Sequence, residues 1–230
     1  MAKESILSWT PAAVVFDCDG TLMDSEQHWQ EARELVLRGY GVAPDRTFAA
    51  RAKGLHYAQC GQLMAETAGR AGLAVEMTRQ LLDAFRKLVA ENPVTCPGAH
   101  ELVLAAAEFA PLAVASNCPR DVVESSLDQA GLLSCFAHVV VPEDGLPPKP
   151  DPAVYLRAVE LCGAAAADSL AVEDSACGIR SAVGAGLRVL GVGPRPSEQE
   201  ITMADLWVGT LAEPTVLDWA ASWKANCPVA

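Results

Sequence analysis

Short apolar runs alternate with longer stretches of helical spacing along most of the chain. The first run spans residues 12–16, and five more follow at 112–116, 138–141, 170–173, 188–192 and 206–208. Runs of this length suit buried strands of a parallel sheet, and helical stretches lie between most of them. Strands that alternate with helices indicate βαβ units, so we predict an α/β fold built on a parallel sheet.

The segment between the first and second runs has a different pattern. Helical patterns cover residues 25–38, 57–68 and 78–90, and nothing between 24 and 92 resembles a strand. We therefore predict a catalytic α/β core made of residues 1–23 and 93–230. An all-helical domain, residues 24–92, is inserted into it after the first strand.

Charge is also divided between these two parts. Residues 24–91 contain nine Lys or Arg and nine Asp or Glu, so this segment is neutral. The remainder has eight basic and twenty acidic residues, which gives the whole chain its net charge of −12. A neutral insert with nine basic residues, on an otherwise acidic protein, can present a local positive face to an anionic substrate.

Size and composition exclude several classes of protein. The chain has 230 residues, 51% of them apolar, which is enough for a sizeable core. The net negative charge argues against nucleic acid or an anionic membrane as a partner. No run approaches the roughly 18 apolar residues of a membrane span, and the start is too short and polar for a signal peptide. We expect a cytoplasmic protein, and the sequence points to no protein partner.

Eight cysteines raise the alternatives of disulfides or structural zinc. None forms a C-x-x-C pair, and most lie in apolar surroundings. Structural zinc usually needs ligands clustered at short spacing, and disulfides are rare in a reducing compartment. We therefore predict free, reduced thiols.

Two carboxylates follow the first apolar run. Asp17 and Asp19 are separated by one residue and followed by Gly20, a natural turn residue. In open α/β sheets ligands bind beyond the carboxyl ends of the strands, which is where both acids are expected. Carboxylates this close repel each other unless a cation lies between them or one holds a proton. For this motif alone, an ordinary strand followed by an Asx turn is the alternative.

Polar residues also follow two later strands. Ser116 ends the run at 112–116 and Asn117 follows it, where a helix N-terminus offers backbone N–H groups to an anion. An ordinary helix cap is the alternative. Lys149 lies in a stiff Pro-rich segment after the run at 138–141, and an oriented ammonium beside acids suits a phosphate.

A second acidic pair lies at the end of the run at 170–173. Glu173 and Asp174 end that strand, and Ser175 is placed to cap the next helix. Together with Asp17 and Asp19, this pair can supply an oxygen-rich, partly hydrated Mg²⁺ site.

In this order the motifs resemble the haloacid dehalogenase-like superfamily of phosphotransferases. The resemblance covers essentially the whole chain. It rests on D-C-D-G-T at 17–21, S-N at 116–117, K-P-D-P at 149–152 and E-D-S at 173–175. It implies a Rossmann-like core with a helical cap after the first strand, as in the beta-phosphoglucomutase and phosphoglycolate phosphatase subgroup.

The resemblance also implies roles for the motif residues. Asp17 would attack phosphorus to form an aspartyl-phosphate, and Asp19 would serve as general acid and then general base. The implied ligands of Mg²⁺ are Asp17, Asp19 through its backbone carbonyl, Glu173 and Asp174. The implied phosphate-binding residues are Ser116, Asn117 and Lys149.

The cap is expected to determine which ester binds. Its candidate specificity residues lie in the stretch 46–57 and are Lys53, His56 and Tyr57. Arg46 and Arg51 are predicted to be solvated helix charges. His28 and Trp29, one turn into the first cap helix, are candidates to face the cleft.

Four functions compete on this evidence. A Mg²⁺-dependent phosphatase acting on a small phosphorylated metabolite is the leading prediction, and a beta-phosphoglucomutase-like phosphomutase is the alternative. The mutases of this subgroup use an Arg shortly after the K-G of the cap loop, where this chain has Tyr57. A haloacid dehalogenase would lack the second acid of D-x-D. A non-catalytic binding module would be expected to lose one of the acids or Lys149.

Overall fold

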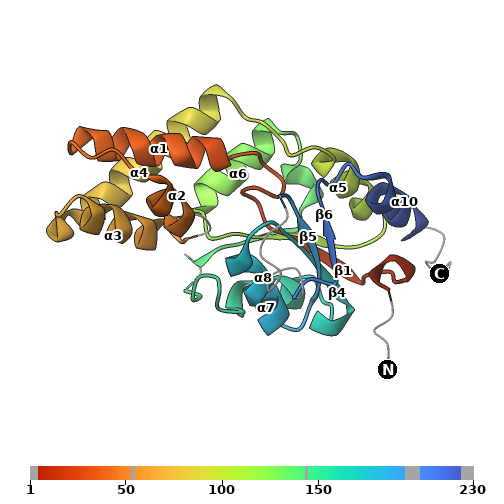
Figure 1. Cartoon of the computed structure of the whole chain (residues 1–230). Coiled ribbons are helices and arrows are strands. Elements are labelled where there is room, and N and C mark those ends of the chain that lie inside the picture. Colours follow the sequence, from red (N-terminus) through yellow and green to blue (C-terminus); the bar gives the residue numbers. More distant parts are fainter. Residues whose placement is uncertain (1–4, 53–54, 143–144, 195–202, 224–230) are drawn as a thin grey trace.

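Six parallel strands form one sheet at the centre of the molecule (Figure 1). The computed structural model describes residues 5–52, 55–142, 145–194 and 203–223. A short 3-10 helix, η1 (Ile6–Ser8), precedes the sheet. The strands are β1 (Ala13–Phe16), β2 (Leu112–Ala115), β3 (His138–Val140), β4 (Ser169–Glu173), β5 (Arg188–Val192) and β6 (Leu206–Val208). All six predicted apolar runs therefore form strands, and the α/β parallel-sheet prediction is confirmed.

The strand order places β1 at the centre of the sheet. The order is β3-β2-β1-β4-β5-β6, so the chain moves outward from β1 in one direction and then returns to its other side. Val15 of β1 is in register with Ala113 of β2 and with Ala171 of β4. A ligand site is expected where the order reverses, beyond the carboxyl ends of β1 and β4.

Alternate residues of the strands build a core on each face of the sheet. Val14 and Phe16 point into one core and Val15 into the other, and all three are fully buried. The first core contains α5 (Ala99–Ala107), α6 (Arg120–Gln129) and α10 (Pro214–Ser222). The second contains α7 (Ala153–Leu161) and α8 (Ala176–Gly184). Two further 3-10 turns are η3 (Leu133–Cys135) and η5 (Ala166–Asp168).

A group of helices follows β1 and lies to one side of the sheet (Figure 1). It consists of α1 (Glu26–Gly39), α2 (Arg46–Ala52), α3 (Tyr57–Thr67), η2 (Ala71–Leu73) and α4 (Ala74–Glu91). Helix α4 packs against both α1 and α3. Its buried residues Met77, Leu81, Phe85 and Val89 recur every four positions and form the centre of this group. The predicted helical cap inserted after the first strand is therefore present.

Two details of the cap differ from the prediction. The third predicted helix, at 78–90, begins earlier, at Ala74. Val75 is 86% exposed, so the first turn of α4 breaks the apolar periodicity that the prediction relied on. The stretch 46–57, predicted as a specificity loop, contains the short helix α2 before the start of α3.

Free thiols are found at every described cysteine. These are Cys18, Cys60, Cys96, Cys118, Cys135, Cys162 and Cys177, while Cys227 lies outside the described residues. The prediction of unpaired cysteines holds for these seven. None of the described helices combines the length and the apolar character needed to cross a bilayer.

Candidate active site

Asp17 lies at the carboxyl end of the central strand. Its backbone N–H donates to the carbonyl of Val172, at 2.9 Å, so β1 and β4 stay paired up to the acid. The chain then turns at Gly20, which has φ +88°. A Cβ on Gly20 would lie 2.4 Å from Oδ2 of Asp174, so a larger residue here would strain the backbone and displace the Asp174 carboxylate.

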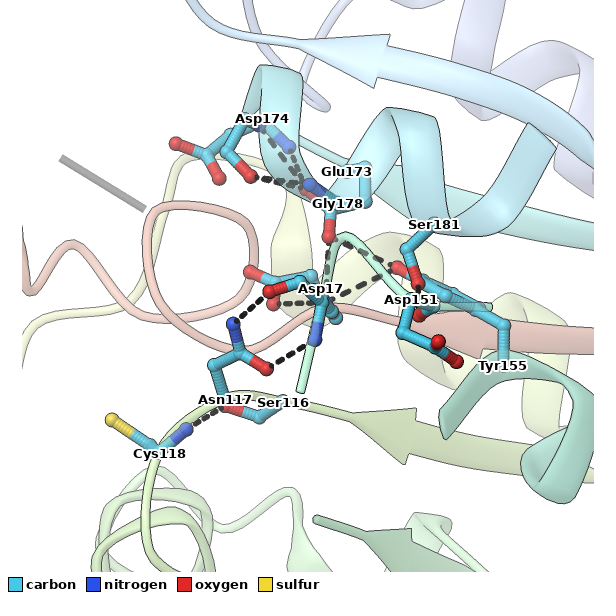
Figure 2. A network of polar contacts seen from close by, with 12 residues as sticks. Asp17, Ser116, Asn117, Cys118, Asp151, Tyr155, Glu173, Asp174, Gly178 and Ser181 are labelled. Carbon is cyan, nitrogen blue, oxygen red and sulfur yellow. Dashed lines mark hydrogen bonds and ion pairs between the residues drawn. The ribbon is translucent and has the colours of Figure 1, made fainter. Parts of the chain in front are cut away.

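Lys149 connects the two acidic strand ends. Its Nζ donates to Oδ1 of Asp17 at 2.7 Å and to Oε1 of Glu173 at 2.6 Å. Both acids are labelled in Figure 2. All three side chains are buried. Burial alone would lower the pKa of Lys149, but the carboxylates of Asp17 and Glu173 raise it above its ordinary value. The two carboxylates therefore favour the charged, ammonium form of Lys149.

The charge of Asp17 depends on this ammonium. Burial raises the pKa of Asp17, the Lys149 charge works against that rise, and the nearby Glu173 and Asp174 add to it. An additional cation at this point would further favour the ionised carboxylate that a nucleophile requires.

Asn117 positions Lys149 through the backbone. The N–H of Lys149 donates to Oδ1 of Asn117 at 2.8 Å, and Nδ2 of Asn117 donates to the carbonyl of Lys149 at 3.2 Å. Ser116 is buried next to it, and its Oγ accepts from the N–H of Cys118 at 3.0 Å. The S-N and K-P motifs therefore meet at the same edge of the sheet, as predicted, with the Asn117 side chain holding the lysine.

Glu173 is fully buried and accepts hydrogen bonds at both oxygens. Oε1 accepts from Lys149 and from the hydroxyl of Tyr155, the latter at 3.1 Å. Oε2 accepts from the N–H groups of Asp174 and Ser175 and from the Ser175 hydroxyl, at 3.0 to 3.1 Å. A Cβ on Gly178 would lie 1.5 Å from Oε1, so α8 approaches this carboxylate only because residue 178 is glycine (Figure 2).

Three carboxylates form a group with the chemistry of a divalent metal site. Ligand oxygens of Asp17, Glu173 and Asp174 all lie within 4.8 Å of one another. Oxygen-only donors suit a hard cation such as Mg²⁺. Glu173 accepts hydrogen bonds from five donors, so its carboxylate is held in place beside those of Asp17 and Asp174. The predicted ligand atom of Asp19 is its backbone carbonyl oxygen, and the Asp19 side chain is not part of this group.

Asp19 is held instead by the first cap helix. Its Oδ1 accepts from the hydroxyl of Ser25 at 2.5 Å and from Nε1 of Trp29 at 3.3 Å. Trp29 itself stacks on Phe85 of α4, with ring centroids 3.7 Å apart. A side chain at the predicted acid–base position is thus oriented by groups from the cap.

A cavity lies between the sheet edge and the cap. Core residues line its floor, among them Asp17, Asp19, Ser116, Asn117, Lys149 and Asp174. The cap contributes Glu26, Trp29, Arg33, Ala52, Leu55, Tyr57 and Cys60. Residues from all four predicted strand ends therefore line a single cavity, whereas Glu173 is fully buried and does not line it.

The candidate specificity residues have different positions. Tyr57 lines the cavity. His56 caps α3, because its Nδ1 accepts from the N–H of Ala58 at 3.3 Å. Lys53 lies outside the described residues. Of the two residues considered for the first cap helix, Trp29 lines the cavity, whereas His28 is buried and does not.

Sequence reasoning missed two important side chains. Arg33 is one of nine basic residues in the insert. Its position seven residues after Glu26 places both on one face of α1, and this spacing is the signal that could have identified it. Tyr155 lies on the apolar face of α7, and its hydroxyl bond to Glu173 leaves no mark in the sequence. Arg46 and Arg51 are exposed and do not line the cavity, as predicted for solvated charges.

Comparison with known proteins agrees with this geometry. The family described as haloacid dehalogenase-like hydrolase matches residues 14–192, which include all four motifs. The chain belongs to this family. It is 30% identical to validoxylamine A 7'-phosphate phosphatase of Streptomyces hygroscopicus subsp. limoneus over 207 residues, 86% of this chain and 93% of that protein. It is 29% identical to hexitol phosphatase A of Escherichia coli (strain K12) over 206 residues, 88% and 92% of the two chains.

Solved structures of the family share the fold. Beta-phosphoglucomutase from Clostridium difficile superposes with a TM-score of 0.80 at 17% identity, covering 94% of this chain and 100% of that one. At this identity the likeness concerns the arrangement of sheet and cap.

Proposed function

We propose that this haloacid dehalogenase-like hydrolase is a Mg²⁺-dependent phosphatase that acts on a small phosphomonoester of a sugar or polyol. The observation that carries the proposal is the contact of Lys149 with Asp17 and Glu173 at the floor of the cavity, 2.7 and 2.6 Å long. The names of the two relatives, a validoxylamine A 7'-phosphate phosphatase and a hexitol phosphatase, support the substrate class.

The first half of the reaction uses Asp17 and Asp19. A carboxylate oxygen of Asp17 attacks phosphorus, the ester P–O bond breaks, and Asp19 gives its proton to the departing alkoxide. The second half restores the enzyme. Asp19 takes a proton from water, the oxygen of that water bonds to phosphorus, and the acyl phosphate bond to Asp17 breaks to release inorganic phosphate.

Charge compensation is the second requirement of phosphoryl transfer. Lys149 lies against the attacking carboxylate and offsets its repulsion of a phosphate dianion. Ser116 and Asn117 lie beside it at the phosphate end of the cavity. Asp17, Asp174 and Glu173, with the backbone carbonyl of Asp19, would hold Mg²⁺. When bound, the ion would neutralise phosphoryl oxygens and favour the ionised form of Asp17.

The helical segment, residues 24–92, is proposed to act as the specificity domain over a core of 1–23 and 93–230. Its contribution to the cavity wall supports this division. Tyr57 contacts the cavity directly, and we propose that Lys53 and His56 act with it in choosing the substrate. Because the described thiols are free, we also propose a cytoplasmic location.

A phosphomutase remains the second candidate because the cavity does contain a cap arginine. This arginine is Arg33 of α1, whereas position 57, where the mutases have an arginine, is a tyrosine. However, Nη2 of Arg33 is 2.9 Å from Oε1 of Glu26, so its charge is already matched by a carboxylate. A mutase must grip a second phosphate, which requires cationic side chains available to it. This observation favours the phosphatase.

One assay separates the two candidates. The protein is incubated with Mg²⁺, beta-glucose 1-phosphate and a catalytic amount of glucose bisphosphate, and in parallel with a panel of sugar and polyol phosphates. We expect release of inorganic phosphate from the panel and little glucose 6-phosphate. Rapid formation of glucose 6-phosphate without release of phosphate would favour the mutase instead.

A further inference from the structure

Three side chains of α1 face the cavity in a single stripe. Glu26, Trp29 and Arg33 occupy positions i, i+3 and i+7 of this helix, and all three line the cavity. This spacing places side chains on one face, one helical turn after another. The stripe therefore forms a continuous part of the cap wall of the cavity that Asp17 and Lys149 also line.

Arg33 is an unusual residue for a cavity wall because its charge is buried. Its side chain is 5% exposed, whereas that of its partner Glu26 is 42% exposed. Nη2 donates to Oε1 of Glu26 at 2.9 Å, and Nη1 points at the carbonyl of Ala52 at 3.4 Å. A buried guanidinium is tolerated when paired in this way. The pair therefore carries no net charge, and its carboxylate is the part that a bound ligand can contact.

Trp29 fixes the middle of the stripe. It is held by stacking on Phe85 and by the hydrogen bond from Nε1 to Asp19. An immobilised ring between two polar groups is a pre-organised surface, with little ordering left to be done when a ligand binds. Such a surface matches a chain or ring of carbons that carries several hydroxyl groups.

Charge decides between hydroxyl and anionic ligands. Among the described residues that line the cavity, the cationic side chains are Lys149 and Arg33, and each contacts a carboxylate. A second anionic group on the substrate would meet Glu26 before it met Arg33. A hydroxyl group, in contrast, can donate to the Glu26 carboxylate and accept from the guanidinium.

We propose that Glu26 and Arg33 are the specificity-determining pair of this cavity and select a polyol or sugar phosphate whose leaving group carries hydroxyls and no second anionic group. The inference rests on the proposed phosphatase function and goes further by naming the side chains and the charge of the leaving group.

The test compares a neutral with an anionic leaving group in matched variants. Sorbitol 6-phosphate, phosphoglycolate and p-nitrophenyl phosphate serve as substrates for the wild type, Glu26→Gln and Glu34→Gln. Glu34 lies on the same helix, where it pairs with Arg38 on the exposed side, so Glu34→Gln is the matched control. We expect the wild type to prefer sorbitol 6-phosphate to phosphoglycolate by at least about tenfold in kcat/KM.

Removing the charge of Glu26 should reverse this preference in part. Gln keeps the size of the side chain but leaves Arg33 uncompensated, so the guanidinium becomes available to a carboxylate. We expect the ratio of sorbitol 6-phosphate to phosphoglycolate to fall about tenfold or more in Glu26→Gln and to stay unchanged in Glu34→Gln. An unchanged ratio in Glu26→Gln, or a wild type that prefers phosphoglycolate, would overturn the proposal.

A binding measurement keeps the inference separate from the proposed function. Dissociation constants of the two metabolites are measured by calorimetry on Asp17→Asn protein, with and without Glu26→Gln. Failure to hydrolyse even p-nitrophenyl phosphate with Mg²⁺ would count against the phosphatase. The ratio of the two dissociation constants would still test the pair, and the same tenfold change is expected there.

Discussion

Arg86 of the cap helix α4 and Asp121 of the core helix α6 form a two-point ion pair. Nε of Arg86 donates to Oδ2 of Asp121 at 2.9 Å, and Nη2 donates to Oδ1 at 3.3 Å. The side chains are 40% and 63% exposed. The pair joins cap and core outside the cavity, since neither residue lines it. The Arg86–Asp121 pair therefore helps to hold the cap against the core, and we call it the latch.

Breaking this latch should weaken substrate binding more than stability. An exposed ion pair contributes only about 0–1 kcal/mol, so Arg86→Ala should lower Tm slightly. A cap that spends less time over the cavity should raise KM a few-fold. Arg157→Ala is the matched control, because Arg157 pairs with Glu160 within the core helix α7 and contacts no cap residue through that pair. Steady-state kinetics at low and high salt provide the measurement, and equal KM values for the two variants would contradict the latch.

Substitution of Asp17 should remove turnover and spare the fold. Asp17→Asn is nearly isosteric, and Lys149 keeps its contact with Glu173. Loss of a covalent nucleophile should cost several orders of magnitude in kcat. Asp19→Asn should cost roughly 10²- to 10⁴-fold, as for a general acid–base group. Rates are compared with circular dichroism spectra, and an Asp17→Asn enzyme with a tenth of normal kcat would refute the covalent route.

The acidic group should respond to metal ions. Mg²⁺ that binds the native state raises Tm and is needed for activity, so EDTA should remove activity and added Mg²⁺ should restore it. Asp174→Asn should weaken this response, since Asp174 belongs to the three-carboxylate group. Asp168→Asn is the control at the opposite end of β4, where η5 ends. Thermal shift against Mg²⁺ concentration measures both, and identical curves would argue against the site.

Two glycines of α8 should differ sharply in their tolerance of alanine. In Gly178→Ala the new Cβ would lie 1.5 Å from Oε1 of Glu173, so the carboxylate must leave its place beside Lys149. In Gly184→Ala the nearest atom would be 3.7 Å away, on Pro152. We expect Gly178→Ala to lose both Tm and kcat. Gly184→Ala should be neutral or more stable by up to about 1 kcal/mol. Similar melting curves would show that α8 can shift.

The thiols near the acids should be unreactive. Burial raises the pKa of Cys18 and Cys118, and burial together with nearby aspartates raises the pKa of Cys96 to about 12. A higher pKa leaves less thiolate at pH 8, and thiolate is the reactive form. Iodoacetamide should therefore label these positions slowly in native protein and quickly in denaturant, as followed by mass spectrometry. Fast native labelling at Cys118 would contradict this expectation.

The strand ends could be predicted from the sequence because each carries its own local pattern. A buried run followed by polar residues is visible at Asp17 or at Glu173 without knowledge of any other part of the chain. What joins them is not local: Lys149 reaches Asp17 across 132 positions, and the pairing depends on the strand order. The bonds between the Asn117 amide and the Lys149 backbone could not be predicted either, because only the folded loops define that contact.

The cap was harder to predict than the core. Its helices follow from apolar spacing, but the residues that face the cavity depend on how α1 is turned relative to the sheet. Arg33 and Glu26 looked like ordinary surface charges in the sequence, and the 5% exposure of the Arg33 side chain appears only after packing.

The residues of the α1 stripe differ in how freely they can be substituted without loss of the reaction. Glu26 and Arg33 stand on a helix that adds no strand to the sheet and no ligand to the carboxylate group. Substitutions at these two positions can change the substrate preference of the enzyme without altering the reaction at Asp17. Trp29 is different because it also holds Asp19. In a randomised library selected on new esters, substitutions should therefore accumulate at positions 26 and 33 and be purged at 29.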